Sequence, residues 1–162
     1  NKSGDTGPTQ TIGNLQRQWL RYHAQYALSK ALDMRHRIEY TGVRLPEGGF
    51  QSGWMIYSEL VYSPMLGKLS FSARYALFDT EGFDSRIYTY ERDVLYSFNV
   101  PAYFGRGNRF YLIVSYQPTR WSDLTVRLAQ TYFADRDQNG SGLNTIDGPG
   151  RTELKVQYRV RF

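Results

Sequence analysis

The stretch that decides the fold is residues 151–162, which read RTELKVQYRVRF. Every second residue is apolar or small, and this set is Thr152, Leu154, Val156, Tyr158, Val160 and Phe162. The residues between them are polar or charged: Arg151, Glu153, Lys155, Gln157, Arg159 and Arg161. Because successive side chains of a strand point to opposite faces, the alternation predicts a β-strand with one apolar and one charged face. A soluble sheet can show the same pattern, with its apolar face on a core.

Six earlier segments repeat this pattern: 18–29, 34–45, 52–63, 69–80, 109–118 and 124–135. Each is close to the length of about 10 residues that a tilted strand needs to cross a membrane. The alternation is less regular in 52–63 and 109–118, where both faces carry apolar residues. No apolar run approaches the roughly 20 residues of a membrane-crossing helix, so the sequence does not predict one.

Short and long connections alternate along the chain. The short ones are 30–33, 65–68 and 119–123, and the long ones, rich in Gly, Asp and Asn, are 46–51, 81–108 and 135–150. Outer-membrane barrels have short periplasmic turns and long extracellular loops. The sequence therefore predicts an all-β fold, a transmembrane antiparallel up-and-down β-barrel.

The strand count depends on residues 87–97, which also alternate. We interpret them as an outer hairpin, or a segment folded into the barrel mouth, within a long outer loop at 81–108. Seven strands remain, and single-chain bacterial barrels have even strand numbers. Residues 1–162 are therefore expected to form a single segment, the last seven strands of a larger barrel, with outer loops at 1–14 and 135–150. The alternative is a complete eight-stranded barrel that uses 87–97 as a strand.

Two parts of the sequence resemble known barrels. The ending Tyr158-Arg159-Val160-Arg161-Phe162 resembles the C-terminal signature of outer-membrane proteins, in which Tyr158, Val160 and Phe162 would be the assembly signal. This resemblance implies the bacterial cell outer membrane, with the lipid bilayer, lipopolysaccharide and the outer-membrane assembly machinery as partners. Residues 70–162 are similar to barrels of the Bacteroidota, some of which carry an N-terminal helix-hairpin-helix domain. The motifs are Phe78-Asp79-Thr80, Asp84-Ser85-Arg86-Ile87-Tyr88, Val100-Pro101-Ala102-Tyr103 and Gly105-Arg106-Gly107.

One face of the predicted strands would line the barrel lumen. Its charged residues are Arg21, Arg35, Arg37, Glu39, Glu59, Arg74, Arg127, Arg151, Glu153, Lys155, Arg159 and Arg161. Nine bases against three acids predict a positive wall, and rings of Arg and Lys favour anions in pores. The alternative is that acids on missing strands, or on an inward-folded loop, neutralise the wall.

These features predict a channel or transport component with a basic lumen and no cofactor. The alternative is a structural or scaffolding barrel of an envelope protein complex. An enzyme is least favoured, because His23 is predicted to face the lumen and His36 the lipid, and no spacing singles out a catalytic triad. Nucleic-acid binding is not predicted, because the basic residues alternate with lipid-type residues within strands.

Two further patterns have structural interpretations. Residues 135–140, which read DRDQNG, are similar to the start of a calcium-binding loop. The twelfth position is Ile146, where that loop needs a Glu, so we interpret the segment as a turn and predict no metal site. Aromatic residues near the strand ends are interpreted as interfacial girdles: Trp19, Tyr26, Tyr40, Trp54, Tyr62, Tyr75, Tyr116 and Tyr132.

Overall fold

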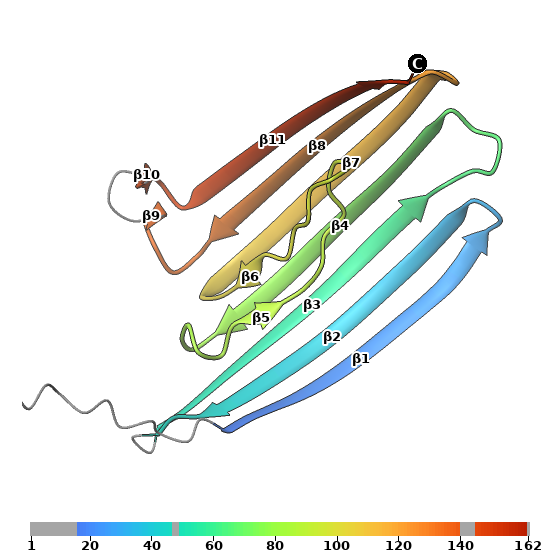
Figure 1. Cartoon of the computed structure of the whole chain (residues 1–162). Helices are drawn as coiled ribbons and strands as arrows, with labels where there is room; N and C mark the ends of the chain where they lie inside the picture. The colour runs from blue at the N-terminus through green and yellow to red at the C-terminus, as the bar shows by residue number, and fades with distance from the viewer. Residues whose placement is uncertain (1–15, 47–48, 140–144, 162) are drawn as a thin grey trace, which may run out of the picture.

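A computed structural model of the chain describes residues 16–46, 49–139 and 145–161 (Figure 1). Within them, seven long strands form one antiparallel sheet in the order β1-β2-β3-β4-β7-β8-β11. Their bounds are β1 (Gln16–Ser29), β2 (Leu32–Arg44), β3 (Phe50–Tyr62), β4 (Leu69–Thr80), β7 (Arg106–Thr119), β8 (Ser122–Phe133) and β11 (Gly150–Val160). Two short pairs stand apart from it, β5 (Ile87–Tyr88) with β6 (Ala102–Tyr103) and β9 (Gln138–Asn139) with β10 (Ile146–Asp147).

The predicted all-β, up-and-down order is confirmed. Each of the seven predicted strands is present, and each pairs with the next long strand along the chain. The β1–β2 and β7–β8 connections are tight, because Ser29 pairs with Leu32 and Thr119 pairs with Ser122. Such short links hold consecutive strands antiparallel and leave the long links to the opposite end of the sheet.

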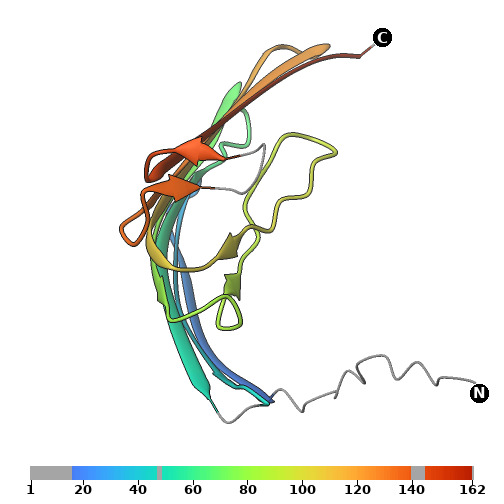
Figure 2. The same cartoon turned by 90° about the vertical axis from the view of Figure 1, so that its left-hand side faces the viewer.

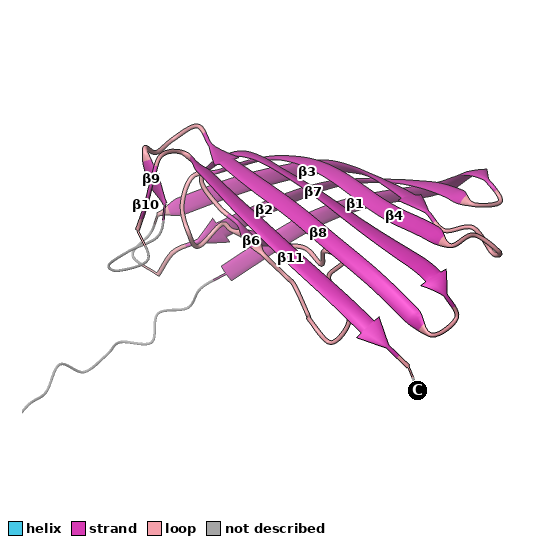
Figure 3. Cartoon of the chain, turned by 90° about the horizontal axis from the view of Figure 1, so that it is seen from above, coloured by secondary structure: helices cyan, strands magenta, loops and turns pink. Residues whose placement is uncertain are grey.

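The sheet is curved, with β1 and β11 at its edges (Figures 1 and 2). In the described part of the chain neither edge has a second partner, so the sheet does not close on itself. Figure 3 shows the seven strands running side by side, with no helix drawn among the described residues. None of these residues forms a helix long and apolar enough to cross a membrane. Barrel closure thus stays a prediction.

Residues 81–105 leave β4, lie over the concave side of the sheet and return to β7 (Figure 2). They form a hairpin, in which β5 pairs with β6 and Glu91 bridges Asn99. Residues 87–97 are therefore not a strand of the main sheet, and the eight-stranded alternative that used them so is wrong. The physical reason is that their alternating charged side chains pair with groups of the concave face, while Tyr96, with φ 67°, turns the backbone out of extended geometry.

The two faces of the sheet have opposite polarity. Charged side chains buried on the concave face are Arg37, Glu39, Glu59, Arg74, Arg109 and Arg127. A small apolar cluster joins the sheet to the hairpin: Met55, Tyr57, Ala76, Phe78, Ile87 and Tyr103. The convex face instead exposes apolar side chains along every long strand, including Leu20, Tyr22, Ile38, Ile56, Tyr75, Tyr116, Leu128, Leu154, Val156 and Tyr158. Alternation therefore sorts the residues as predicted, but the apolar side has no core to cover it among the described residues.

Trp19 differs from its prediction as a girdle residue. The register pairs Trp19 with Thr41, which is buried on the concave face, and the Arg21 guanidinium carbon lies 5.4 Å from the indole centroid. Alternation already places Trp19 on the same face as Arg21 and His23, so its interpretation as a girdle residue, which rested on its position near a strand end, is wrong. By register, the other seven predicted girdle aromatics lie on the convex face.

Candidate functional site

The charged residues predicted to share one face do share it. Side chains of residues directly opposite each other in a ladder lie on the same face. The register pairs Arg21 with Glu39, and Arg127 with Lys155. The same alternation places the rest of the twelve on the concave face, and Arg161, just beyond β11, joins them through an ion pair to Asp123.

The Glu59 cluster lies near the middle of the sheet. Glu59 and Arg74 are buried, and the Arg74 Nη2 donates to Glu59 Oε2 at 3.1 Å. Ser72 Oγ donates to the other carboxylate oxygen at 2.9 Å, and Tyr111 also donates to it. The Arg74 guanidinium carbon lies 4.0 Å from the Tyr57 ring centroid, within cation–π range. A buried ion pair of this kind needs these extra donors, because both charges have lost water.

The Glu39 pair lies beside it, towards the β1 edge. Glu39 accepts two hydrogen bonds from Arg21, each at 3.0 Å, and a further one from Arg37. Arg35 Nη1 lies 3.8 Å from Glu59 Oε2, at the limit of an ion pair. Two acids of the predicted lumen face, Glu39 and Glu59, therefore form ion pairs with four of its bases.

The Glu91 cluster joins the loop to the sheet. Glu91 comes from the loop and is fully buried. Its carboxylate accepts a forked pair of bonds from Arg109, at 2.7 and 3.0 Å, and one from Arg127 Nη2 at 2.5 Å. Tyr103 and Asn99, both from the returning arm of the hairpin, donate at 2.7 and 3.0 Å. One loop carboxylate thus satisfies two guanidinium groups of β7 and β8.

Asp93 extends this cluster to β11. Lys155 Nζ donates to Asp93 Oδ2 at 2.6 Å, and Arg127 Nε lies 3.9 Å from Asp93 Oδ1. Arg127, whose side chain is 0% exposed, also lies 3.6 Å from Glu153. The loop and the last strand are therefore linked through shared charges and not through a backbone ladder.

The surroundings keep these loop acids ionised. Burial alone would raise the pKa of Glu91, but the hydrogen bonds and positive charge of Arg109, with help from Tyr103, hold this pKa below its ordinary value. Burial likewise opposes ionisation of Asp93, and its bond from Lys155 lowers the pKa in net. Burial next to Glu91 raises the pKa of Tyr103 well above its ordinary value, so its hydroxyl stays a donor.

Loop backbone and hydroxyl groups add further bonds to the strands. The bonds are Arg37 to Thr89 Oγ1 at 3.1 Å, Arg74 to Tyr90 O at 2.8 Å, Arg127 to Arg92 O at 3.0 Å, and a reciprocal pair between Gln157 and Leu95 at 2.9 and 3.0 Å. Arg17 of β1 also donates to Asp84 O at 2.5 Å, and Ser52 N of β3 donates to Glu81 Oε2 at 2.6 Å. The loop is thus bonded to all seven long strands. A loop held by so many strands is part of the concave face and not a free surface loop.

The Asp123 cluster lies at the opposite end of the sheet, by the short turns. Arg159 Nη2 and Arg161 Nη2 both donate to Asp123 Oδ2, at 2.6 and 2.8 Å. All three side chains are partly exposed. Among the described residues, the loop makes no bond to these side chains, so water screens this cluster more than the buried ones.

The residues that the sequence prediction missed are those that pair with the predicted bases. Glu91 and Asp93 lie in a segment treated only as a loop, and Asp123 was assigned to a turn. Arg109 lies where both faces of the strand carry apolar residues, so its phase was ambiguous. Every buried base on the described concave face has a carboxylate within ion-pair distance: Arg37 and Arg74 pair with acids of the sheet, and Arg109 and Arg127 pair with Glu91 of the loop.

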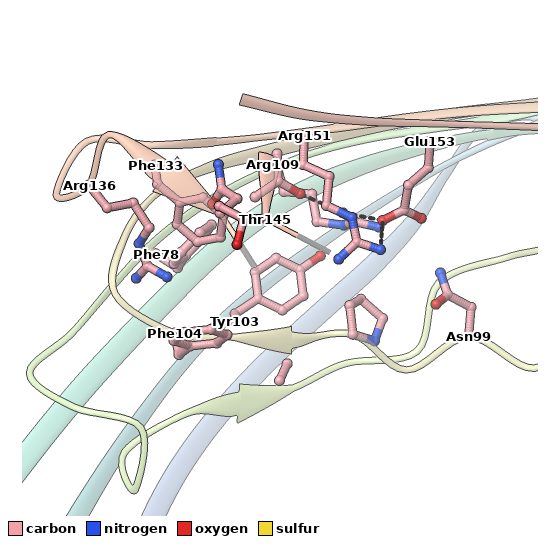
Figure 4. Close-up of a pocket in the computed structure, with 14 residues that line it drawn as sticks. Phe78, Asn99, Tyr103, Phe104, Arg109, Phe133, Arg136, Thr145, Arg151 and Glu153 are labelled. Atoms are coloured by element: carbon pink, nitrogen blue, oxygen red, sulfur yellow. Dashed lines mark hydrogen bonds and ion pairs between the residues drawn. The ribbon is translucent and has the colours of Figure 1, made fainter. Parts of the chain in front are cut away.

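A cavity of about 870 Å³ lies beside the Glu91 cluster, at the end of the sheet with the long connections. Figure 4 shows Arg109, Arg151 and Glu153 gathered on one side of it, near the Tyr103 ring. Phe78, Phe104 and Phe133 lie at its other side (Figure 4). The Arg136 guanidinium carbon lies 4.2 Å from the Phe133 ring centroid. Charged and aromatic walls therefore face the same space.

No family model, curated protein or solved structure matches this chain. The similarity of residues 70–162 to Bacteroidota barrels and that of residues 158–162 to the outer-membrane signature stay predictions. Of the assembly-signal residues, Tyr158 and Val160 are exposed on the convex face, and Phe162 lies outside the described residues.

The two histidines lie on opposite faces, as predicted. His23 is paired in register with Arg37 on the concave side. His36 lies on the convex side, where its ring nitrogens are 2.8 Å from Ser58 Oγ and 3.0 Å from the Tyr26 hydroxyl. The two cannot act on one substrate group.

The segment similar to a calcium loop uses its polar groups on its neighbours. Asp135 pairs with Arg136 at 3.1 Å, and the Asn139 amide donates to Gly148 O at 2.8 Å. Gly140 lies outside the described residues. Within the described ranges, no group of three or more His, Asp or Glu side chains is placed to hold a metal ion.

Proposed function

We propose that this chain is part of a transmembrane β-barrel in the outer membrane of a Gram-negative bacterium, acting as a channel or transport component. The observation that supports this most is the exposed apolar convex face. Among the described residues of the long strands, the charged residues with convex register are Arg44, Asp79 and Arg106, all at the long-connection end. A soluble monomer rarely exposes an apolar patch beyond a few hundred Å². Lipid would cover such a face at no cost in hydrogen bonds, because the strands satisfy their own backbone groups.

In this proposal the concave face is the lumen wall and further strands close the sheet between β1 and β11. Unpaired strand edges are costly in lipid, which favours closure. The bilayer and lipopolysaccharide would surround the barrel, and the assembly machinery would recognise its last strand. Residues 81–105 would lie inside the barrel and narrow the passage.

The wall stays positive even with the loop in place. The register adds Arg17 and Arg109 to the nine predicted bases, and Asp33 and Asp123 to the three predicted acids. The loop, residues 81–105, carries four acids and two bases, so it neutralises only part of the excess positive charge of the concave face. We therefore propose passage of small solutes with a preference for anions.

A structural or scaffolding barrel is the second candidate. The buried Glu91 cluster favours it, because a loop bonded to all seven long strands could close the lumen to solutes. A barrel of this kind would anchor partners of an envelope protein complex.

Conductance of the full-length protein in planar bilayers separates the two candidates. We expect small channels whose reversal potential in a salt gradient shows anion preference. Cation preference would reject the basic-lumen proposal, and a silent protein would favour the scaffold. Nitroxide labels at positions 154 and 156 test the membrane proposal itself: they should be accessible to oxygen in the bilayer, and water accessibility at both would reject it.

A further inference from the structure

The cavity beside the Glu91 cluster has the size and walls of a small-molecule site. Its volume of about 870 Å³ lies within the range of roughly 300–1,000 Å³ typical of ligand pockets. Its lining residues come from the hairpin, from β4, β7, β8 and β11, and from the β8–β11 connection, and the strands hold Arg109, Arg151 and Glu153 in place (Figure 4). Such walls keep polar groups in place before a ligand arrives, which lowers the entropy cost of binding.

The charged side of the cavity presents Arg151 to a ligand. The Arg151 side chain is 57% exposed, and its Nη2 lies 3.3 Å from Glu153 Oε1. Glu153 is shared with two buried guanidinium groups, at 3.7 Å from Arg109 and 3.6 Å from Arg127. Because one carboxylate serves three guanidinium groups, Arg151 keeps capacity for a second acceptor. A planar guanidinium can bind a carboxylate through two parallel bonds.

The local charge balance favours a ligand with one negative charge. The positive groups at or directly behind the wall belong to Arg109, Arg127, Arg136, Arg151 and Lys155, and the carboxylates paired with them belong to Glu91, Asp93, Glu153 and Asp135. Five positive groups against four negative ones leave one unit of positive charge. A carboxylate matches this excess, whereas a phosphate monoester brings about 1.5 to 2 negative charges at neutral pH.

The remaining walls suit a hydroxylated ring. The Asn99 and Asn139 amides each donate one N–H within the protein, to Glu91 and to Gly148 O, and keep a second N–H and a carbonyl oxygen for ligand hydroxyl groups. The Thr131 hydroxyl accepts from Arg109 and can still donate to a ligand. Phe104 and Tyr103 offer apolar surface for the C–H faces of a ring. Among the described lining residues, polar and charged types outnumber apolar ones. A purely apolar acid would leave the remaining hydrogen-bonding capacity of these amides unused.

We infer that this cavity binds an acidic sugar of one or two units, a hexuronate, with its carboxylate on Arg151 and its hydroxyl groups on Asn99 and Asn139. Acetate would pair with the Arg151 charge and make no use of the remaining N–H and carbonyl groups of the amides. A neutral hexose would hydrogen-bond to the amides and leave the Arg151 guanidinium without an anionic partner from the ligand. The site does not depend on the proposed membrane function, since all of its groups belong to the described chain.

Calorimetric titration of the full chain in detergent micelles tests the ligand class. Galacturonate and its disaccharide are the probes, with galactose, acetate and galactose 6-phosphate as comparisons. We expect galacturonate to bind at least about tenfold more tightly than galactose or acetate, the loss of a charge-assisted bidentate contact accounting for the difference. Failure of galacturonate to bind at millimolar concentration, or equal binding of acetate, would overturn the inference. Tighter binding of the sugar phosphate would overturn the choice of carboxylate.

Two matched variants test the place of binding. Arg151→Gln, at an exposed position of an edge strand, should keep the fold and weaken galacturonate binding about tenfold while leaving galactose binding unchanged. Arg120→Gln removes an exposed arginine from the β7–β8 turn, at the opposite end of the sheet, and should change neither. Equal losses in both variants would mean attraction by net charge alone, and no loss in Arg151→Gln would place the ligand elsewhere.

Discussion

The convex and concave faces of the same seven strands carry side chains of opposite polarity. On the convex face, Leu154 and Val156 are exposed and make no polar contact of their side chains. On the concave face, Arg127 and Glu91 are fully buried and paired with each other. Both arrangements follow from one alternating sequence, since neighbouring residues of a strand must face opposite surroundings. The difference indicates that the stabilising charges lie inside and that the outside suits an apolar solvent.

Of the changes that test this difference between the two faces, loss of the Glu91 carboxylate should lower the free energy of unfolding most. Glu91→Gln leaves the Arg109 and Arg127 charges buried without their main partner, and it should lower the free energy of unfolding by about 3 to 5 kcal/mol. Urea unfolding of the lipid-reconstituted protein measures it. The control is Asp84→Asn, which removes a partly exposed ion pair in the loop, with Asp84 Oδ1 3.9 Å from Arg86 Nη1, and should cost less than about 1 kcal/mol. Similar values for the two variants would mean that burial of Glu91 contributes nothing.

A charge on the convex face should have the next largest effect. Val156→Arg near the middle of β11 should cost about 2 to 4 kcal/mol if lipid covers this face. Val156→Leu, which stays apolar, should be close to neutral. Unfolding in vesicles gives both numbers. If the arginine variant is as stable as the leucine variant, the convex face contacts water.

Acid should weaken the concave face more than the convex face. The pKa of Glu91 is lower in the folded protein than its ordinary value of 4.5, so its stabilisation is fully present above that pH. It is lost as pH falls through the lower, folded value. We therefore expect the stability gap between wild type and Glu91→Gln to narrow progressively below about pH 4.5. A gap that stays constant down to pH 3 would show that the carboxylate is not held ionised.

Substitutions at the exposed end of the concave face should change the free energy of unfolding least. Arg159→Gln removes one of two arginines bound to Asp123, and Arg161 still pairs with that carboxylate. Because these side chains are partly exposed, the cost should be about 0.2 to 1 kcal/mol and should shrink further in high salt. A cost as large as that of Glu91→Gln would contradict the distinction between the covered and uncovered parts of this face.

Alternation and connection length were sufficient to predict the strands, their order and the faces of all twelve charged residues. These are local properties: the strand repeat is two residues, and a two-residue turn can join only antiparallel neighbours. Trp19 was misassigned because its position near a strand end was used in place of alternation, which puts it on the same face as Arg21.

The sequence by itself determined which residues share a face; the tertiary structure alone decided which charges meet. Glu91 lies 18 residues from Arg109 and 36 from Arg127 along the chain, and no repeat connects them. Their pairing depends on the path of residues 81–105 across the concave face and on the register of three strands at once. The cavity beside Arg151 arises in the same way, from elements that approach only when the loop is docked. Ion pairs and cavities depend on distances in space, whereas alternation depends only on the geometry of one strand.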